Sequence, residues 1–303
     1  MRVLIVRAGA LGDVLLLRPT LHALRRAGHA VTLLAPSLPA NLLAAELDAV
    51  IPWEGRAVAE LLASDQAAAP AVFGHHDLAV AFTRSAPLVS ALERLMPARS
   101  RDPVPPTGVH AARWALEAVA DLVAAGDLVQ PPISVTSEAH RRAEPLVARL
   151  GPGFLAIHPG SGSPAKSWPR ERFRALADAL APGDEPVLVV EGPADRQAAA
   201  VFDDHPRAVF ARSLELATLG ALLAQARLLI GNDSGVAHLA AAFGAACLVL
   251  FGPTDPREWR PIGPRVSTLE AATLEALELD RVLEAARRLA SPARSNGLEL
   301  PSG

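Results

Sequence analysis

Two side chains are the first candidates for chemistry, an aspartate near the N-terminus and a lysine in the middle of the chain. Asp13 ends a glycine-containing turn, at the point where a helix is expected to begin. Its carboxylate is either a helix N-cap or a general base aimed into a cleft. Lys166 is the single lysine in a chain with 29 Lys and Arg residues. A compact ammonium on a flexible stem suits phosphate, and the alternative is an accident of codon usage.

A second polar group follows a short apolar run in the C-terminal half. The sequence GNDSG is typical of a turn, and three of its residues are expected to cap the next helix: Asp233, Ser234 and Gly235. A helix N-terminus has free N–H groups and a partial positive charge, which suit phosphate. His238, one turn into this helix, is either a packed core residue or part of the same site.

Two further residues are candidates for binding a nucleotide. Glu191 follows an apolar strand, at the position where an acidic residue reaches ribose hydroxyls in nucleotide-binding α/β domains. Asp195, four residues later, competes with it and is otherwise a simple N-cap. Ser161 lies in the same Gly/Ser-rich loop as Lys166 and offers a hydroxyl donor.

The elements that must position these side chains alternate along the chain. Apolar strands are predicted at residues 2–7, 31–34, 49–53, 78–82, 154–158, 187–190, 208–210, 227–230 and 247–251. Helices are predicted at residues 14–27, 109–125, 138–150, 170–180, 217–225, 236–243 and 269–290. Strands separated by helices pair in parallel, and ligands bind beyond the carboxyl ends of such strands. The polar loops fall at those ends.

The alternation breaks between about residues 128 and 153 and then restarts. A chain of 303 residues is of the length expected for two domains. The sequence therefore predicts an α/β protein with doubly wound domains at residues 1–145 and 146–290. A frayed tail is predicted at residues 291–303.

A proline-rich loop is predicted at residues 97–108, with four arginines around it: Arg94, Arg99, Arg101 and Arg113. Such a cluster is either solvated surface or a site for an acidic partner. An anionic glycolipid at the inner membrane face is one such partner, which would make the protein peripheral to that membrane.

Composition excludes several classes of function. The net charge of −3 argues against a nucleic-acid partner. The single cysteine, Cys247, lies in an apolar strand and is predicted to be a buried thiol. No cluster of residues has metal-ligand spacing, so no metal and no cofactor are expected. The apolar runs are too short to span a bilayer and the N-terminus lacks a signal-peptide pattern, which together predict a cytoplasmic protein.

Four motifs in sequence order carry a resemblance to a known family: ALGDVLL at 10–16, KSWP at 166–169, GNDSGVAH at 231–238 and FGPTDP at 251–256. Together they resemble glycosyltransferase family 9, the ADP-heptose:lipopolysaccharide heptosyltransferases. The resemblance implies a GT-B architecture, in which two Rossmann-like domains face each other across a cleft. It also implies an inverting, metal-independent transfer of heptose from ADP-heptose to a lipopolysaccharide-core or other glycan acceptor.

Roles follow from the resemblance residue by residue. Asp13 matches the general base that deprotonates the acceptor hydroxyl. Lys166 and Ser161 match groups that contact the donor phosphates, and Glu191 resembles the position that holds the ribose. Four residues match the donor-binding signature: Asp233, Ser234, Gly235 and His238.

Three alternatives remain open. The chain could be a non-catalytic nucleotide-sugar-binding module, or a glycosyltransferase of the same fold that uses another nucleotide sugar. An epimerase or dehydrogenase acting on nucleotide sugars is disfavoured, because a full G-x-G-x-x-G fingerprint is missing and the chain contains no tyrosine for a Tyr-x-x-x-Lys dyad.

Overall fold

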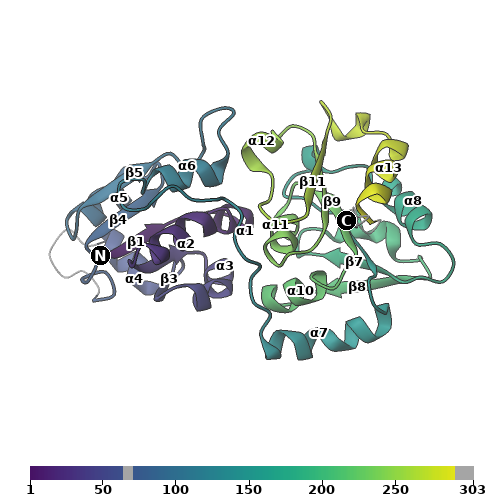
Figure 1. The fold of residues 1–303 in the computed structure, drawn as a ribbon, viewed down its shortest axis with the longest axis horizontal. Coiled ribbons are helices and arrows are strands. Elements are labelled where there is room, and N and C mark those ends of the chain that lie inside the picture. The colour runs from purple at the N-terminus through teal and green to yellow at the C-terminus, as the bar shows by residue number, and fades with distance from the viewer. Residues whose placement is uncertain (64–70, 291–303) are drawn as a thin grey trace, which may run out of the picture.

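The computed structural model describes residues 1–63 and 71–290, so the predicted tail at 291–303 lies outside the described residues. The chain forms two separate sheets, one in each half (Figure 1). All strand pairs are parallel. This arrangement confirms the predicted α/β class.

The first sheet has five strands in the order β3 (Ala49–Pro52), β2 (Ala30–Ala35), β1 (Arg2–Val6), β4 (Leu78–Phe82) and β5 (Ala98–Arg101). Its helices are α1 (Leu11–Leu15), α2 (Arg18–Arg26), α3 (Ser37–Leu42), α4 (Arg56–Ala63), α5 (Ala86–Glu93) and α6 (Ala111–Glu117). Alternate residues of β1 face opposite layers, as the period of a strand requires. Leu4 and Val6 pack with α4 and α5, whereas Val3 and Ile5 pack with α2 and α6.

The second sheet has six strands in the order β11 (Val266–Glu270), β10 (Cys247–Phe251), β9 (Leu228–Asn232), β6 (Leu155–His158), β7 (Val187–Glu191) and β8 (Ala208–Arg212). Its helices are α7 (Ser137–Leu150), α8 (Arg170–Leu180), α9 (Arg196–Ala199), α10 (Leu216–Leu223), α11 (Gly235–Ala242), α12 (Pro256–Trp259) and α13 (Leu279–Ala290). Helices α8 and α13 cover one face, and α7, α10 and α11 cover the other.

The two halves pack together through their inner helical layers. One apolar cluster runs from Ile5 and Leu21 in the first half to Leu239 and Phe243 in the second. Helix α1 lies against α11, so the first helical turn of the chain meets the helix that follows β9 (Figure 1). This contact brings the two predicted halves of the site together.

The connection between the sheets is tied to both halves. The Arg18 guanidinium donates to the Pro131 carbonyl (2.9 Å), and the Ile133 N–H donates to the Ala242 carbonyl (2.8 Å). Helix α7 then packs against α10 of the second half. The boundary predicted at residues 145 and 146 falls inside α7.

The start of the chain differs from the prediction of one helix at 14–27. Two helices form instead, because Pro19 lacks an N–H and begins a new helix near its own position. The first helix starts at Leu11 with Ala10 as its N-cap, so the prediction of Asp13 as an N-cap is wrong. Asp13 is the third helical residue, and its carboxylate accepts the Ala10 N–H (2.8 Å).

Three other element predictions are corrected. Strand β5 lies within the predicted loop at 97–108. Strand β11 includes the first two residues of the predicted helix at 269–290, and helix α13 begins only at Leu279. Both β5 and β11 are edge strands, and neither has a buried residue or a continuous apolar run, which is the pattern that predicted the other strands. The predicted helix at 109–125 is shorter, because after Glu117 successive N–H groups bond three residues back. Cys247 is buried as predicted, and burial raises the pKa of its thiol to about 12.

Candidate active site

A cavity of about 450 Å³ is lined by both halves of the molecule. The first half contributes Ala10, Gly12, Asp13 and Leu16, and the second contributes Gly162, Ser163, Lys166, Asp233, Ser234, Gly235, His238, Thr254 and Trp259. A larger cavity of about 670 Å³ lies beside β11, but it contains none of the predicted site residues. The volume of a cavity therefore does not identify the candidate site. The smaller cavity is the candidate because several titratable side chains converge on it.

Asp13 is held by contacts within its own half. Its Oδ1 accepts from Arg7 Nη2 (2.6 Å), and its Oδ2 accepts from the Ala10 N–H (2.8 Å). Arg7 follows the end of β1, is 7% exposed and also donates to the Pro103 carbonyl (2.7 Å). Each carboxylate oxygen thus has one donor and keeps a lone pair for a proton from the cavity.

Lys166 reaches the cavity from the loop after β6. Its Nζ donates to Asp233 Oδ2 (3.0 Å), which also accepts from Thr254 Oγ1 (2.8 Å). The Lys166 side chain remains 32% exposed, whereas that of Asp233 is 9% exposed. An ammonium has three N–H donors, so this contact leaves donors for an anionic ligand.

Helix α11 begins at the wall of the cavity. Ser234 is its N-cap, and the Ser234 hydroxyl accepts the Ala237 N–H (3.4 Å). The next residue must be small, because a Cβ at Gly235 would lie 3.1 Å from Leu11 Cβ across the interface. The absence of a side chain at this point lets α1 approach the helix N-terminus closely.

His238 is 6% exposed and lies one turn into α11. It contacts the other half, since a Cβ at Gly12 would lie 2.9 Å from His238 Cδ2. Burial lowers the pKa of His238 to about 4, and the nearby carboxylates of Asp233 and Asp13 oppose that shift. The imidazole is therefore neutral near pH 7. The interpretation of His238 as a packed residue is confirmed; it also lines the cavity, where its role in donor binding stays a prediction.

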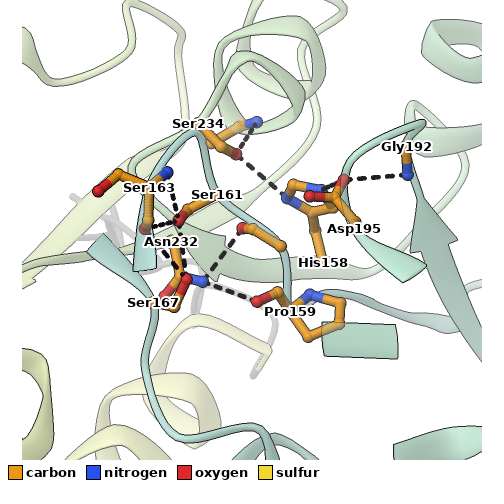
Figure 2. Close-up of polar contacts among 11 residues, drawn as sticks. His158, Pro159, Ser161, Ser163, Ser167, Gly192, Asp195, Asn232 and Ser234 are labelled. Atoms are coloured by element: carbon orange, nitrogen blue, oxygen red, sulfur yellow. Dashed lines mark hydrogen bonds and ion pairs between the residues drawn. The ribbon is translucent and has the colours of Figure 1, made fainter. Parts of the chain in front are cut away.

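The loop that carries Lys166 is anchored by a buried amide. Asn232, at the end of β9, is fully buried. Its Nδ2 donates to the Pro159 carbonyl (3.0 Å; Figure 2) and to the Gly160 carbonyl (3.1 Å). Its Oδ1 accepts the Trp168 N–H (2.9 Å). The amide thereby holds both ends of the loop against the sheet.

Ser161 is engaged within this loop. Its hydroxyl lies 2.8 Å from the Ser167 hydroxyl and accepts the Ser163 N–H (3.2 Å). Ser161 lines a neighbouring cavity of about 460 Å³ rather than the one that contains Asp13, while Gly162 and Ser163 line both. Its predicted phosphate contact stays a prediction.

Glu191 is also outside the central cavity. Its Oε2 pairs with Arg212 Nε (2.9 Å) and lies 3.6 Å from Arg196 Nη1. A role at the ribose stays a prediction. The interpretation of Asp195 as a simple N-cap is wrong: its carboxylate accepts the Gly192 N–H (3.0 Å) and contacts His158 instead of capping α9.

Sequence reasoning missed four residues that support the site: Arg7, His158, Asn232 and Thr254. Asn232 lies in the GNDSGVAH motif and Thr254 in the FGPTDP motif, so the sequence pattern already pointed to both positions. Arg7 directly follows β1 and His158 is the last residue of β6, and only the folded structure shows what they contact.

The predicted arginine cluster is largely engaged within the protein. Arg99 forms a two-pronged ion pair with Asp121 (2.7 Å for each bond). Arg101 stacks over the Trp114 ring, 3.6 Å from its centroid, and donates to the Trp114 carbonyl (2.6 Å). These contacts favour a structural role for the two side chains over a free acidic-partner site.

Within residues 1–63 and 71–290, no group of three or more His, Cys, Asp or Glu side chains could hold a metal ion. Over the same described residues, none of the helices is long and apolar enough to cross a membrane.

A match to a known family model identifies the family. Residues 98–284 match the model of glycosyltransferase family 9 (heptosyltransferase), and the chain belongs to that family. A lipopolysaccharide heptosyltransferase 3 from Escherichia coli is 34% identical over 120 residues, which are 38% of this chain and 35% of that protein. A lipopolysaccharide heptosyltransferase 1 from Pseudomonas aeruginosa is 33% identical over 128 residues, covering 41% and 36%. These matches span only about a third of the relatives' own length.

Two solved structures share the fold over nearly the whole chain. A family 9 glycosyltransferase from Veillonella parvula has a TM-score of 0.79 at 20% identity, covering 95% of this chain and 97% of that one. The E. coli ADP-heptose lipopolysaccharide heptosyltransferase II has a TM-score of 0.76 at 18% identity, covering 96% and 98%. At such identity the similarity establishes the fold and no more.

Proposed function

We propose that this chain is a glycosyltransferase that moves heptose from ADP-heptose onto a lipopolysaccharide-core or related glycan acceptor. The proposal rests on one observation: Asp13 from the first half and Lys166 from the second line the same cavity. In the proposed GT-B arrangement, the first domain binds the acceptor and the second binds the donor. The names of the relatives support heptose as the sugar and lipopolysaccharide as the acceptor class.

Asp13 is the general base in the proposed reaction. The acceptor hydroxyl oxygen attacks the anomeric carbon, and its proton passes to the Asp13 carboxylate. The bond from the anomeric carbon to the diphosphate oxygen breaks on the opposite side, so the configuration inverts. One displacement needs one base, and no covalent intermediate on a second carboxylate is required.

The second half stabilises the departing diphosphate. As the bond breaks, negative charge grows on the diphosphate oxygens. The Lys166 ammonium and the N-terminus of α11 line the cavity, so they are in place to offset this charge without reorganising. Charge stabilisation by these groups supports a metal-independent reaction. Packing of α1 against α11 limits the water that could hydrolyse the donor.

The test is a thermal-shift screen with nucleoside diphosphates and their sugars. Ligand at 100 times its Kd stabilises the folded state by about 2.7 kcal/mol, which is enough to resolve the donor. The proposal predicts selective stabilisation by ADP and ADP-heptose, unchanged by EDTA. Stabilisation by another nucleotide alone would contradict the donor. No stabilisation by any nucleotide would contradict the proposed activity.

A further inference from the structure

Behind the proposed donor site lies a buried pair that the reaction above does not use. His158 ends β6 and Asp195 precedes α9, and their side chains meet with His158 Nε2 3.0 Å from Asp195 Oδ2. The two residues are 2% and 9% exposed. A buried imidazole and carboxylate are costly to desolvate unless each polar atom has a partner.

The pair continues to the N-cap of α11. His158 Nδ1 lies 3.1 Å from the Ser234 hydroxyl (Figure 2). The Ser234 oxygen already accepts the Ala237 N–H, so its own O–H is free to donate to Nδ1. The Nε2–H then donates to Asp195, which also accepts the Gly192 N–H. Every donor in this series of hydrogen bonds has one acceptor, which fixes a single tautomer of His158.

The backbone around Asp195 is shaped to admit its carboxylate. A Cβ at Gly192 would lie 2.6 Å from Asp195 Oδ2, and a Cβ at Gly160 would overlap the same carboxylate. Both glycines belong to loops at the carboxyl ends of strands, and neither has a positive φ. Glycine at these two positions therefore serves the close approach of Asp195 and not a turn conformation.

The other end of the chain of hydrogen bonds is the helix terminus that faces the cavity. Ser234 and Gly235 line the cavity. The N–H groups of Gly235 and Val236 have no acceptor within α11, because the first N–H groups of a helix precede any intrahelical carbonyl. Because the Ser234 hydroxyl occupies the Ala237 N–H, these two N–H groups remain available to a ligand in the cavity.

We infer that His158 and Asp195 are positioning residues that orient Ser234 and thereby aim the N-terminus of α11 at the donor diphosphate. The inference rests on the proposed function, because it assigns the ligand of that helix terminus as a diphosphate. His158 itself touches no substrate. His158 acts only through the Ser234 hydroxyl, so once that hydroxyl is removed the imidazole no longer affects ligand binding.

Two substitutions separate the two bonds of the imidazole. In His158→Gln the amide reaches the place of Nε2 and retains the contact with Asp195, but it loses Ser234. In His158→Asn the amide reaches the place of Nδ1 and retains Ser234, but it loses Asp195. A matched control is His205→Gln, because His205 is also buried and pairs with Asp178 (3.0 Å) in the same half, away from the cavity.

The experiment is isothermal titration with inorganic pyrophosphate and, separately, with ADP. We expect His158→Gln and Ser234→Ala each to weaken both affinities about tenfold, and His158→Asn to weaken them less. The double variant His158→Gln/Ser234→Ala should bind no worse than Ser234→Ala alone, since the two residues act through one contact. His205→Gln should bind as the wild type does. Asp195→Asn, which preserves size, is the second variant if His158→Gln fails to fold.

The outcomes distinguish this inference from the proposed function. If the wild type binds ADP and His158→Gln binds it equally well, the inference is wrong and the function stands. Equal losses in His158→Gln and His205→Gln, or additive losses in the double variant, would also overturn it. A wild type that binds pyrophosphate but not ADP contradicts the nucleotide, and the pyrophosphate data alone then decide the role of His158. Binding of neither ligand overturns both.

Discussion

The two halves of the cavity are built in different ways. The first half offers the proposed base, Asp13, which is held by Arg7 and by the Ala10 N–H. The second half offers a lysine and a helix terminus, and both are supported from behind by buried polar groups such as Asn232 and His158. The loops after β6, β9 and β10 all contribute to it.

This difference matches the two proposed tasks, proton acceptance in the first half and diphosphate binding in the second. A proton acceptor needs one group at the right place, and two hydrogen bonds suffice to orient it. A diphosphate needs several donors that are fixed before it arrives, because donors that reorganise lose much of their effect. The family match covers residues 98–284, which includes the whole of the second sheet but only β5 of the first.

The largest effect is expected from the first half. Asp13→Asn preserves the shape of the side chain but removes the proton acceptor, so kcat should fall about 10²- to 10⁴-fold. Steady-state release of ADP from ADP-heptose with a lipopolysaccharide acceptor measures it. Leu16→Met, at the same cavity wall, is the control and should retain most of the activity. Unchanged turnover in Asp13→Asn would show that Asp13 is not the general base.

A somewhat smaller effect is expected from the lysine of the second half. Lys166→Met removes the charge that offsets the leaving diphosphate, and kcat/KM should fall about 10²- to 10³-fold, as for the loss of one preorganised donor. Lys166→Arg retains the charge and should recover part of the loss. The same assay compares them. Equal activity of the Met and Arg variants would show that the charge is irrelevant.

The smallest effect concerns stability at the junction of the halves. The pKa of His238 is lowered from 6.5 to about 4, so below pH 6.5 the unfolded chain binds a proton that the folded chain does not. Stability is thus intact above pH 6.5 and is lost as the pH falls toward 4. Between pH 7.5 and 5 this loss is about 2 kcal/mol.

The measurement is urea unfolding at both pH values. His238→Gln cannot titrate, so its free energy of unfolding should change by about 2 kcal/mol less than that of the wild type. The pKa of Glu46 is lowered from 4.5 to about 2, so this carboxylate affects stability below the pH window of the measurement. Its contribution is the same in both proteins and cancels when they are compared. An identical pH dependence in both proteins would mean that His238 is not buried as a neutral group.

The sequence predicted the strands that carry the site, because buried parallel strands are continuous apolar runs and their polar loops follow directly. It failed at β5 and β11, because these two edge strands are largely polar and none of their residues is buried. It placed Asp13 at the cavity but with the wrong helix position, since Pro19 divides the helix and Ala10 is the N-cap of its first part. His158 looked like the end of a strand, and only its contacts in space give it a role.

The most direct test of the division between the halves is ADP affinity in two variants, measured by isothermal titration. The account predicts that Asp13→Asn binds ADP as tightly as the wild type or more tightly, because one negative charge leaves the cavity. It predicts that Lys166→Met binds ADP at least about tenfold more weakly, the equivalent of about 1.4 kcal/mol. Equal weakening in both variants, or none in Lys166→Met, would contradict it.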